Sequence, residues 1–194
     1  MITLSEHSIV ISPVGTVDNE LVEPISMGIK RIFGYKTEVI PFFKDVNFAL
    51  DPKREQYHST PILKKLEEAA PVQAIKVIGI TSVDLFIPIL THVYGEAQIG
   101  GAACIISTHR LAEGLSVAAD KDTYYKRVAK EAVHELGHTF KLRHCKDNAC
   151  IMHYCRSIKD VDRKSEHLCR YCKTLLEDEM KRIAVSSGLI ADSS

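Results

Sequence analysis

The sequence of 194 residues lacks several features that would point to particular classes of protein. It contains no tryptophan, and its 25 basic and 25 acidic residues leave no formal net charge, which argues against a nucleic-acid partner. No apolar run approaches the roughly 20 residues that span a bilayer, so we expect no membrane association. Residues 1–6 have neither the basic nor the apolar part of a secretory leader. We therefore expect a cytoplasmic protein, and the composition carries no indication of its oligomeric state.

Hydrophobic residues make up 45% of the chain and charged residues 26%, which is ordinary for a globular protein. A chain of this length fits one domain. We expect residues 1–194 to form that single domain, with an N-terminal α/β part over 1–141 and a C-terminal part over 142–194. The second part has few apolar residues to bury, so it needs a stabilising cross-link such as a metal site.

The most informative motif is the sequence HELGH at residues 134–138. Residues four apart on an α-helix lie on one face, so His134 and His138 can bind one metal ion. Glu135 lies beside them and can reach a water molecule on that ion. This pattern is typical of a zinc site that carries its own general base.

His144 is the candidate third ligand. It follows His138 by six residues, which corresponds to about 600° of rotation on a continuous helix, so it would then face away from the metal. We therefore expect the helix to end within residues 139–143 and the chain to turn back. Three imidazoles leave one position open for water, which is typical of catalytic rather than structural zinc.

Cysteines form a second pattern directly after His144. The spacing C-x4-C followed by C-x2-C suits a closed tetrahedral thiolate site for structural zinc, on Cys145, Cys150, Cys169 and Cys172. Two disulfides are the alternative, and a reducing cytoplasm disfavours them. Cys155 is a further alternative as a ligand, because Cys145, Cys150 and Cys155 are evenly spaced.

The remaining sequence predicts an α/β organisation. The first strand, helix and second strand imply a right-handed crossover between parallel neighbours. Residues 42–58 and 114–119 read as irregular, and Gly34 and Gly188 are expected to end helices. The expected strands are 8–11, 37–40, 74–80, an edge strand at 96–99 and a central strand at 102–106. The expected helices are 18–33, 61–70, 122–140 and 166–186.

Together these residues resemble one family, the archaemetzincins, a branch of the metzincin metallopeptidases. The specific match is H-E-x-x-H-x-x-K-x-x-H-C-x4-C-x-M over residues 134–152, followed by C-x-x-C at 169–172. Further blocks extend the resemblance over most of the chain: Arg54-Glu55-Gln56-Tyr57, residues 79–86 (GITSVDLF) and residues 107–111 (STHRL).

The resemblance implies a metzincin-like fold, with a mixed, mostly parallel sheet, helices and a zinc-stapled C-terminal subdomain. It implies a catalytic zinc on the three histidines with Glu135 as base, and a second zinc on the four cysteines. It also implies a Met-turn at Met152 beneath the catalytic metal. Tyr154 either helps to hold the oxyanion, as in astacin-like enzymes, or is a half-buried structural tyrosine.

Lys141 departs from the metzincin pattern, which has glycine at this position to let the backbone turn after the helix. A lysine in the left-handed region costs about 1 kcal/mol relative to glycine. This cost is small against the binding energy of a structural zinc, which is on the order of 10 kcal/mol. We therefore expect the turn to form around Lys141.

The sequence thus predicts a zinc metallopeptidase with two zinc ions per chain and a peptide or protein substrate. Glu135 would take a proton from a zinc-activated water and pass it to the leaving amine. The resemblance implies aminopeptidase-like activity only weakly. The alternatives are a non-catalytic zinc or peptide-binding protein that retains the site, and a zinc-ribbon interaction module built on the four cysteines.

Overall fold

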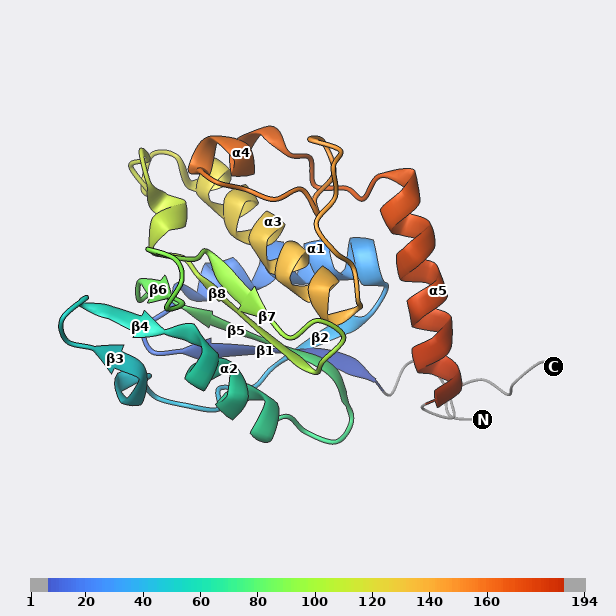
Figure 1. The fold of residues 1–194 in the computed structure, drawn as a ribbon, viewed down its shortest axis with the longest axis horizontal. Coiled ribbons are helices and arrows are strands. Elements are labelled where there is room, and N and C mark those ends of the chain that lie inside the picture. Colours follow the sequence, from blue (N-terminus) through green and yellow to red (C-terminus); the bar gives the residue numbers. More distant parts are fainter. Residues whose placement is uncertain (1–6, 187–194) are drawn as a thin grey trace.

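The computed structural model describes residues 7–186. Helices cover both faces of its central sheet (Figure 1). The first four strands in spatial order pair in parallel, and the last pairs antiparallel and forms the sheet edge. This arrangement confirms the mixed, mostly parallel sheet. The strands in spatial order are β2 (Lys36–Val39), β1 (Ser8–Val14), β5 (Ala74–Thr81), β8 (Ala103–Ser107) and β7 (Gly95–Ala97).

Successive residues of the inner strands pack on opposite faces of the sheet. In β1, Ile9 and Ile11 belong to the core on one face and Val10 to the core on the other. In β8, Ile106 and Ile105 are divided in the same way. Side chains alternate along a strand, so a strand buried on both faces is apolar throughout. The continuous apolar runs that mark β5 and β8 in the sequence have this origin.

Two helices cover one face and one covers the other (Figure 1). α1 (Val22–Phe33) and α3 (Lys121–Thr139) pack on the face that carries Ile9, and α2 (Ser59–Glu68) packs on the face that carries Val10. A short 3-10 turn, η2 (Asn19–Leu21), precedes α1. Pro24 therefore falls in the first turn of α1, where its missing amide hydrogen costs little.

Short strands replace part of the region that the sequence predicted to be irregular. β3 (Leu50–Asp51), β4 (Gln56–His58) and β6 (Leu85–Phe86) form a second, three-stranded sheet, after the 3-10 turn η3 (Asn47–Ala49). The prediction for 42–58 was wrong here because strands of two or three residues are too short to show an alternating pattern.

The C-terminal part also differs from the prediction. A helix α4 (Ile158–Arg163) was missed, although Ser157 and Asp160 form a capping box at its start. The last helix, α5 (Arg170–Ser186), begins four residues later than expected, and Gly188 lies outside the described residues.

β8 is an inner strand next to the edge rather than the centre of the sheet. Within residues 7–186 no helix has the length and apolarity needed to cross a membrane.

Candidate metal centres

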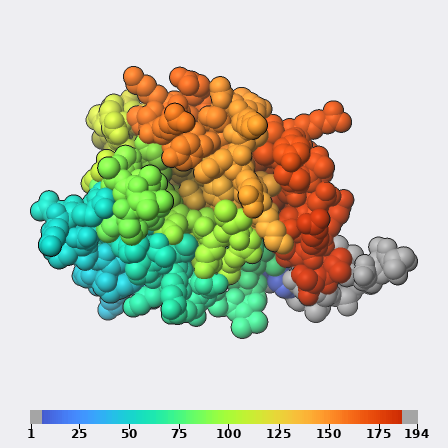
Figure 2. All heavy atoms as spheres, in the orientation of Figure 1, coloured from blue at the N-terminus to red at the C-terminus, as the bar shows by residue number. Residues whose placement is uncertain are grey.

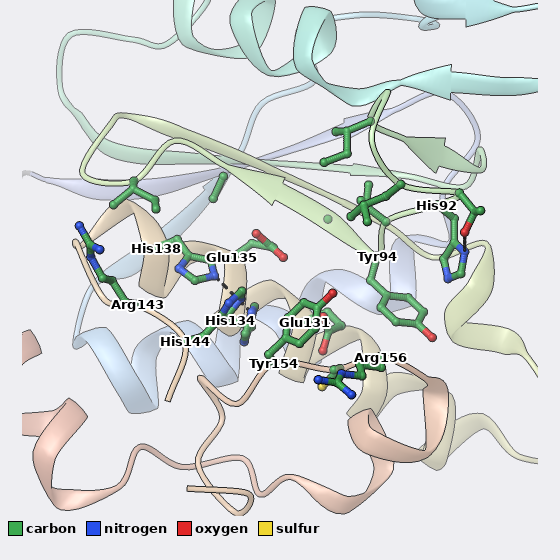
Figure 3. Close-up of a pocket in the computed structure, with 18 residues that line it drawn as sticks. His92, Tyr94, Glu131, His134, Glu135, His138, Arg143, His144, Tyr154 and Arg156 are labelled. Carbon is green, nitrogen blue, oxygen red and sulfur yellow. Dashed lines mark hydrogen bonds between the residues drawn. The ribbon is translucent and has the colours of Figure 1, made fainter. Parts of the chain in front are cut away.

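The three candidate histidines meet at one point, although they come from two different segments. His134 and His138 lie one turn apart on α3, and their Nε2 atoms are 3.3 Å apart. His144 reaches the same point from beyond the helix, and one nitrogen of each ring lies within 4.8 Å of the others. Figure 3 shows the three rings turned toward one another in a cleft. The expected convergence is confirmed.

The turn that delivers His144 is a Schellman motif centred on Lys141. The amide of Lys141 donates to the carbonyl of His138 (3.0 Å), and the amide of Leu142 donates to that of Gly137 (3.0 Å). Lys141 has φ 63°, in the left-handed region. The helix therefore ends where the sequence placed its end, with a lysine in a position that favours glycine.

Backbone carbonyls fix the tautomers of the two helical histidines. His134 Nδ1 lies 2.9 Å from the carbonyl oxygen of Ile151, and His138 Nδ1 lies 2.7 Å from that of Leu142. A carbonyl only accepts, so each Nδ1 donates its hydrogen, and Nε2 of a neutral ring is left without one. Two nitrogen lone pairs thus face each other at 3.3 Å, an arrangement that a shared cation would relieve.

The spacing of these nitrogens fits tetrahedral zinc. Zinc–nitrogen bonds of about 2.0–2.1 Å at a tetrahedral angle place two ligand nitrogens about 3.3–3.4 Å apart, as observed for His134 and His138. Burial is the main cause that lowers the pKa of His134 and of His138. Burial and, to a smaller extent, the neighbouring His138 lower the pKa of His144 to about 4. Neutral imidazoles are the form that binds metal.

Glu135 projects into the same cleft from the neighbouring position on α3 (Figure 3). Its side chain packs directly against Gly95 of β7, where a Cβ atom would lie 2.6 Å from Glu135 Cγ. Burial, together with the charges on Glu131 and Glu96, raises the pKa of Glu135 to about 8 against an opposing effect of Lys164. A glycine at the edge strand is therefore what makes room for this carboxylate.

A buried ion pair supports the floor of the cleft beside Glu135. Lys164 Nζ lies 2.6 Å from Glu131 Oε1, and both side chains are almost completely buried. Although burial lowers the pKa of Lys164, the charge on Glu131 keeps it above its usual value. Glu131 precedes Glu135 by four residues, so helical spacing could have identified it, whereas no local signal identified Lys164.

Met152 packs against α3 between the two helical histidines, in the region where the resemblance implies a Met-turn. It is fully buried, and a Cβ atom at Gly137 would lie 2.5 Å from its sulfur, so it packs directly against the helix between the ligands. Tyr154 is 45% exposed and lines the cleft, with its ring centroid 4.9 Å from that of His144. Its role in holding an oxyanion stays a prediction.

The four candidate cysteines form the second cluster within residues 7–186. The sulfurs of Cys145, Cys150, Cys169 and Cys172 lie within 4.8 Å of one another. Cys155 is not part of this group and lines the cleft instead. All six cysteines of the chain fall in the described part and carry free thiols.

The sulfur geometry favours zinc over disulfides. Cys145 Sγ and Cys169 Sγ are 3.7 Å apart, far beyond the roughly 2.05 Å of a disulfide bond. Four zinc–sulfur bonds of about 2.3 Å at tetrahedral angles give sulfur separations of about 3.8 Å. The amide of Cys169 also donates to Cys150 Sγ (3.3 Å), as backbone amides do for thiolates.

One cleft of about 660 Å³ contains the histidine site. Its lining combines α3 and the segment around Tyr154 with β7 and the loop that precedes it. Several lining residues were not predicted from the sequence, since they come from segments without a metal motif: Tyr94, Glu131, Arg143 and Arg156.

Comparison with known proteins identifies the family of the chain. The sequence profile described as Peptidase family M54 matches residues 43–178. An archaemetzincin from Archaeoglobus fulgidus is 38% identical over 158 residues, which cover 81% of this chain and 91% of the relative.

Solved structures give the same picture. The crystal structure of an archaemetzincin from Methanopyrus kandleri superposes with a TM-score of 0.82 at 31% identity, covering 94% of this chain and all of that one. A zinc-dependent peptidase from Methanocorpusculum labreanum superposes with a TM-score of 0.77 at 26% identity, covering 87% of this chain and all of that one. The chain therefore belongs to peptidase family M54, together with the archaemetzincins, and is a zinc metallopeptidase.

Proposed function

We propose that the chain binds two zinc ions and hydrolyses peptide bonds at one of them, with Glu135 as the general base. His134, His138 and His144 hold the catalytic ion, and Cys145, Cys150, Cys169 and Cys172 hold the structural ion. The observation that carries the catalytic site is the pair of unprotonated Nε2 atoms 3.3 Å apart, with their Nδ1 hydrogens already donated to carbonyls.

Zinc bound by the histidines supplies a Lewis acid that acidifies water and polarises the carbonyl of the scissile peptide. The chain's own contribution begins with Glu135, which lies next to a metal ligand in the cleft. Its carboxylate takes the proton of the attacking water and passes it to the leaving amine. The close packing against Gly95 holds the carboxylate in place during both transfers.

The free edge of β7 offers a place for the substrate backbone. Tyr94 and Gln98 are bonded to β8, and antiparallel pairing alternates along the strand, so the polar backbone groups of Gly95 and Ala97 point away from the sheet. Both residues line the cleft. An extended peptide can add to this edge by β-augmentation, which brings its carbonyl to the histidine site.

Replacing Glu135 tests the catalytic proposal. Glu135→Gln keeps the shape of the side chain and removes its basicity, and Glu135→Ala removes it entirely. We expect both variants to keep their zinc and their melting temperature, and to lose about a hundredfold or more in turnover of a fluorogenic peptide library. Glu177→Gln, an exposed change on α5, is the matched control and should keep full activity. Unchanged turnover in both Glu135 variants would instead support a protein that binds peptides without cleaving them.

The same library can test the aminopeptidase-like activity that the family resemblance suggests. An aminopeptidase needs a free amino terminus, so N-acetylation of each peptide should abolish its cleavage. Equal cleavage of free and acetylated peptides, with products from internal bonds by mass spectrometry, would indicate an endopeptidase.

A further inference from the structure

The loop between β6 and β7 forms one wall of the cleft, which we call the cleft wall, residues 87–93. Five of its residues line the cleft: Ile87, Leu90, Thr91, His92 and Val93. His92 and, just after the wall, Tyr94 lie across the cleft from His138 and Arg143 (Figure 3). The wall belongs to no strand or helix, so its position depends on other contacts.

Side chains from β4 and from the turn before it hold the carbonyls of this wall. Arg54 Nη2 donates to the carbonyl oxygens of Leu90 (2.9 Å) and Thr91 (3.1 Å). Gln56 Nε2 donates to the same Thr91 oxygen (3.0 Å). Arg54 Nε also donates to Gln56 Oε1 (3.0 Å), and its guanidinium lies 4.1 Å from the ring centre of Phe86. In Figure 2 the turquoise surface of residues around 50–60 borders the green surface of residues around 87–95.

Asp84 and Arg110 complete this set of contacts from two further segments. Asp84 Oδ2 accepts from Gln56 Nε2 (2.8 Å), and its carboxylate accepts two bonds of 2.7 Å from the Arg110 guanidinium. Arg110 lies in the 3-10 turn η4 (Arg110–Ala112), after β8. Burial raises the pKa of Asp84, but the bonds from Arg110 and Gln56 outweigh it, so the pKa is below its usual value. Bidentate pairs of this kind fix geometry as well as charge.

The four members of this network come from three separate blocks of the sequence. Arg54 and Gln56 come from the REQY block, Asp84 from residues 79–86 and Arg110 from residues 107–111. None of the four lies among the candidate metal ligands, and all four border a second, shallow hollow behind the wall. Arg54 and Gln56 contact the wall directly, at carbonyls 36 and 37 residues from Arg54 in the chain, and Asp84 and Arg110 act through Gln56.

The wall presents apolar side chains at the mouth of the cleft. Leu90 is 40% exposed and Ile89, beside it, is 86% exposed. Ile99 also lines the cleft, from the turn after β7, and is 63% exposed. Large aliphatic side chains left in water around a cleft mark a binding surface for an apolar group.

We propose that Arg54, Gln56, Asp84 and Arg110 are positioning residues that hold the cleft wall so that it selects a bulky apolar side chain of the peptide substrate. This inference rests on the proposed peptidase function and adds a substrate preference to it. A leucine-sized side chain gains contact with the wall at Leu90, whereas an alanine side chain is too short to reach it. The network acts through the wall and does not touch the reacting atoms.

Zinc-directed peptide hydroxamates test this without requiring turnover. The probes are two peptide hydroxamates that differ in one side chain, leucine or alanine, placed in turn on each side of the hydroxamate. In one of these placements the wild-type protein should bind the leucyl compound about tenfold or more tightly by calorimetry. Arg54→Met should reduce that preference to about twofold or less while leaving the affinity for the alanyl compound and the zinc content unchanged.

Hydrogen exchange and kinetics give readouts that a general loss of stability would not reproduce. In Arg54→Met the amides of residues 87–93 should exchange about tenfold faster, with those of α3 unchanged. With a leucyl peptide as substrate, KM should rise while kcat stays within about twofold. Arg54→Lys keeps a charge over Phe86 but loses the planar fork, so it should give an intermediate preference. This variant replaces Arg54→Met in the test if Arg54→Met fails to fold. Arg31→Met, which removes the ion pair with Glu166 elsewhere on the surface, is the control and should change none of these values.

Three outcomes would overturn the inference. One is a wild-type protein that binds both hydroxamates equally or binds neither, and another is a preference that survives in both Arg54 variants. The third is an equal loss of affinity for both compounds, which would indicate a merely structural network. Leucyl preference that depends on Arg54, in a protein that cleaves no peptide, would instead refute the proposed catalysis and leave this inference standing.

Discussion

The two candidate centres are built in opposite ways. The histidine centre takes two ligands from one regular helix and opens into a cleft, and His144 is exposed. The cysteine centre takes two ligands from the irregular segment before α4, with Cys169 just before α5 and Cys172 in its first turn. An open site suits exchange of water and substrate, whereas a closed site suits holding chain segments together.

The two centres are also joined along the chain and across it. His144 and Cys145 are consecutive, and the amide of Cys145 donates to the carbonyl of Met152 (2.8 Å). Ile151, which holds the ring of His134, follows Cys150 directly. A zinc on the cysteines would therefore position both the third histidine and the carbonyl that orients the first. The histidine centre is thus suited to catalysis and the cysteine centre to holding the structure. The experiments below either separate these two roles or measure how they are linked.

Removing metal should produce the largest effect and separate the centres most clearly. We expect a chelator to take zinc from the histidine centre first, with loss of activity and little change in circular dichroism. Loss of the second ion should unfold the C-terminal part, since structural zinc contributes on the order of 10 kcal/mol to folding. The measurement is zinc release by a colorimetric indicator, followed in parallel with circular dichroism and thiol titration. One zinc or none per chain after purification without chelator, or four freely titrating cysteines, would contradict it.

Breaking the buried ion pair Lys164–Glu131 should have the next largest effect. Lys164 follows α4 and Glu131 lies on α3, so the pair links the segment between the cysteines to the helix of the histidines. Lys164→Met leaves a buried, uncompensated carboxylate and should lower the free energy of unfolding by about 3–5 kcal/mol in urea. Adding Glu131→Gln should restore most of this loss. If the double variant is as unstable as Lys164→Met, the cost arises from packing rather than from the unpaired charge.

Gly95→Ala should lower activity without changing the zinc content of the protein. The new Cβ would lie 2.6 Å from Glu135 Cγ and 2.7 Å from the carbonyl oxygen of Ile105. The clash with the backbone oxygen forces β7 to shift, and the clash with Cγ displaces Glu135, so we expect turnover to fall about a hundredfold, or about 2.7 kcal/mol in activation free energy. Gly114→Ala is the control: Gly114 has no neighbour within 4 Å, and its φ of 73° means that alanine should cost backbone strain there without changing turnover. Normal turnover in Gly95→Ala would show that Glu135 tolerates displacement.

The contrast between the centres also explains what the sequence could predict. Helical periodicity and metal-ligand spacing act over a few residues, so the sequence could predict that the histidines meet, that the helix ends near Lys141 and that the four cysteines lie together. Contacts between distant segments leave no local pattern. Nothing in the sequence around Lys164 indicates that it is buried. Nothing around Arg54 indicates that it binds the carbonyls of Leu90 and Thr91. The short strands β3, β4 and β6 were missed for the same reason, because neighbours define them rather than their own residues.

Replacing Lys141 should have the smallest effect on stability. Lys141 lies in the turn that connects the helical histidines to the region of the cysteines. Its φ of 63° predicts that Lys141→Gly relieves about 1 kcal/mol of backbone strain. Its side chain, however, forms an ion pair of 2.7 Å with Glu179 of α5, which is 8% exposed. Removing the lysine therefore leaves this buried carboxylate with only the longer contact to Arg182 (3.5 Å), and the two effects oppose each other.

A change of background separates the two contributions. In the Glu179→Gln protein no ion pair is left to lose, so Lys141→Gly should raise the free energy of unfolding by about 1 kcal/mol. In the wild-type background the same substitution should give a smaller gain or a slight loss, and the difference between backgrounds is the coupling energy of the pair. Urea unfolding of the four proteins supplies every value. If Lys141→Gly destabilises even the Glu179→Gln protein, the left-handed turn costs nothing, and the lysine at this position needs no compensation from α5.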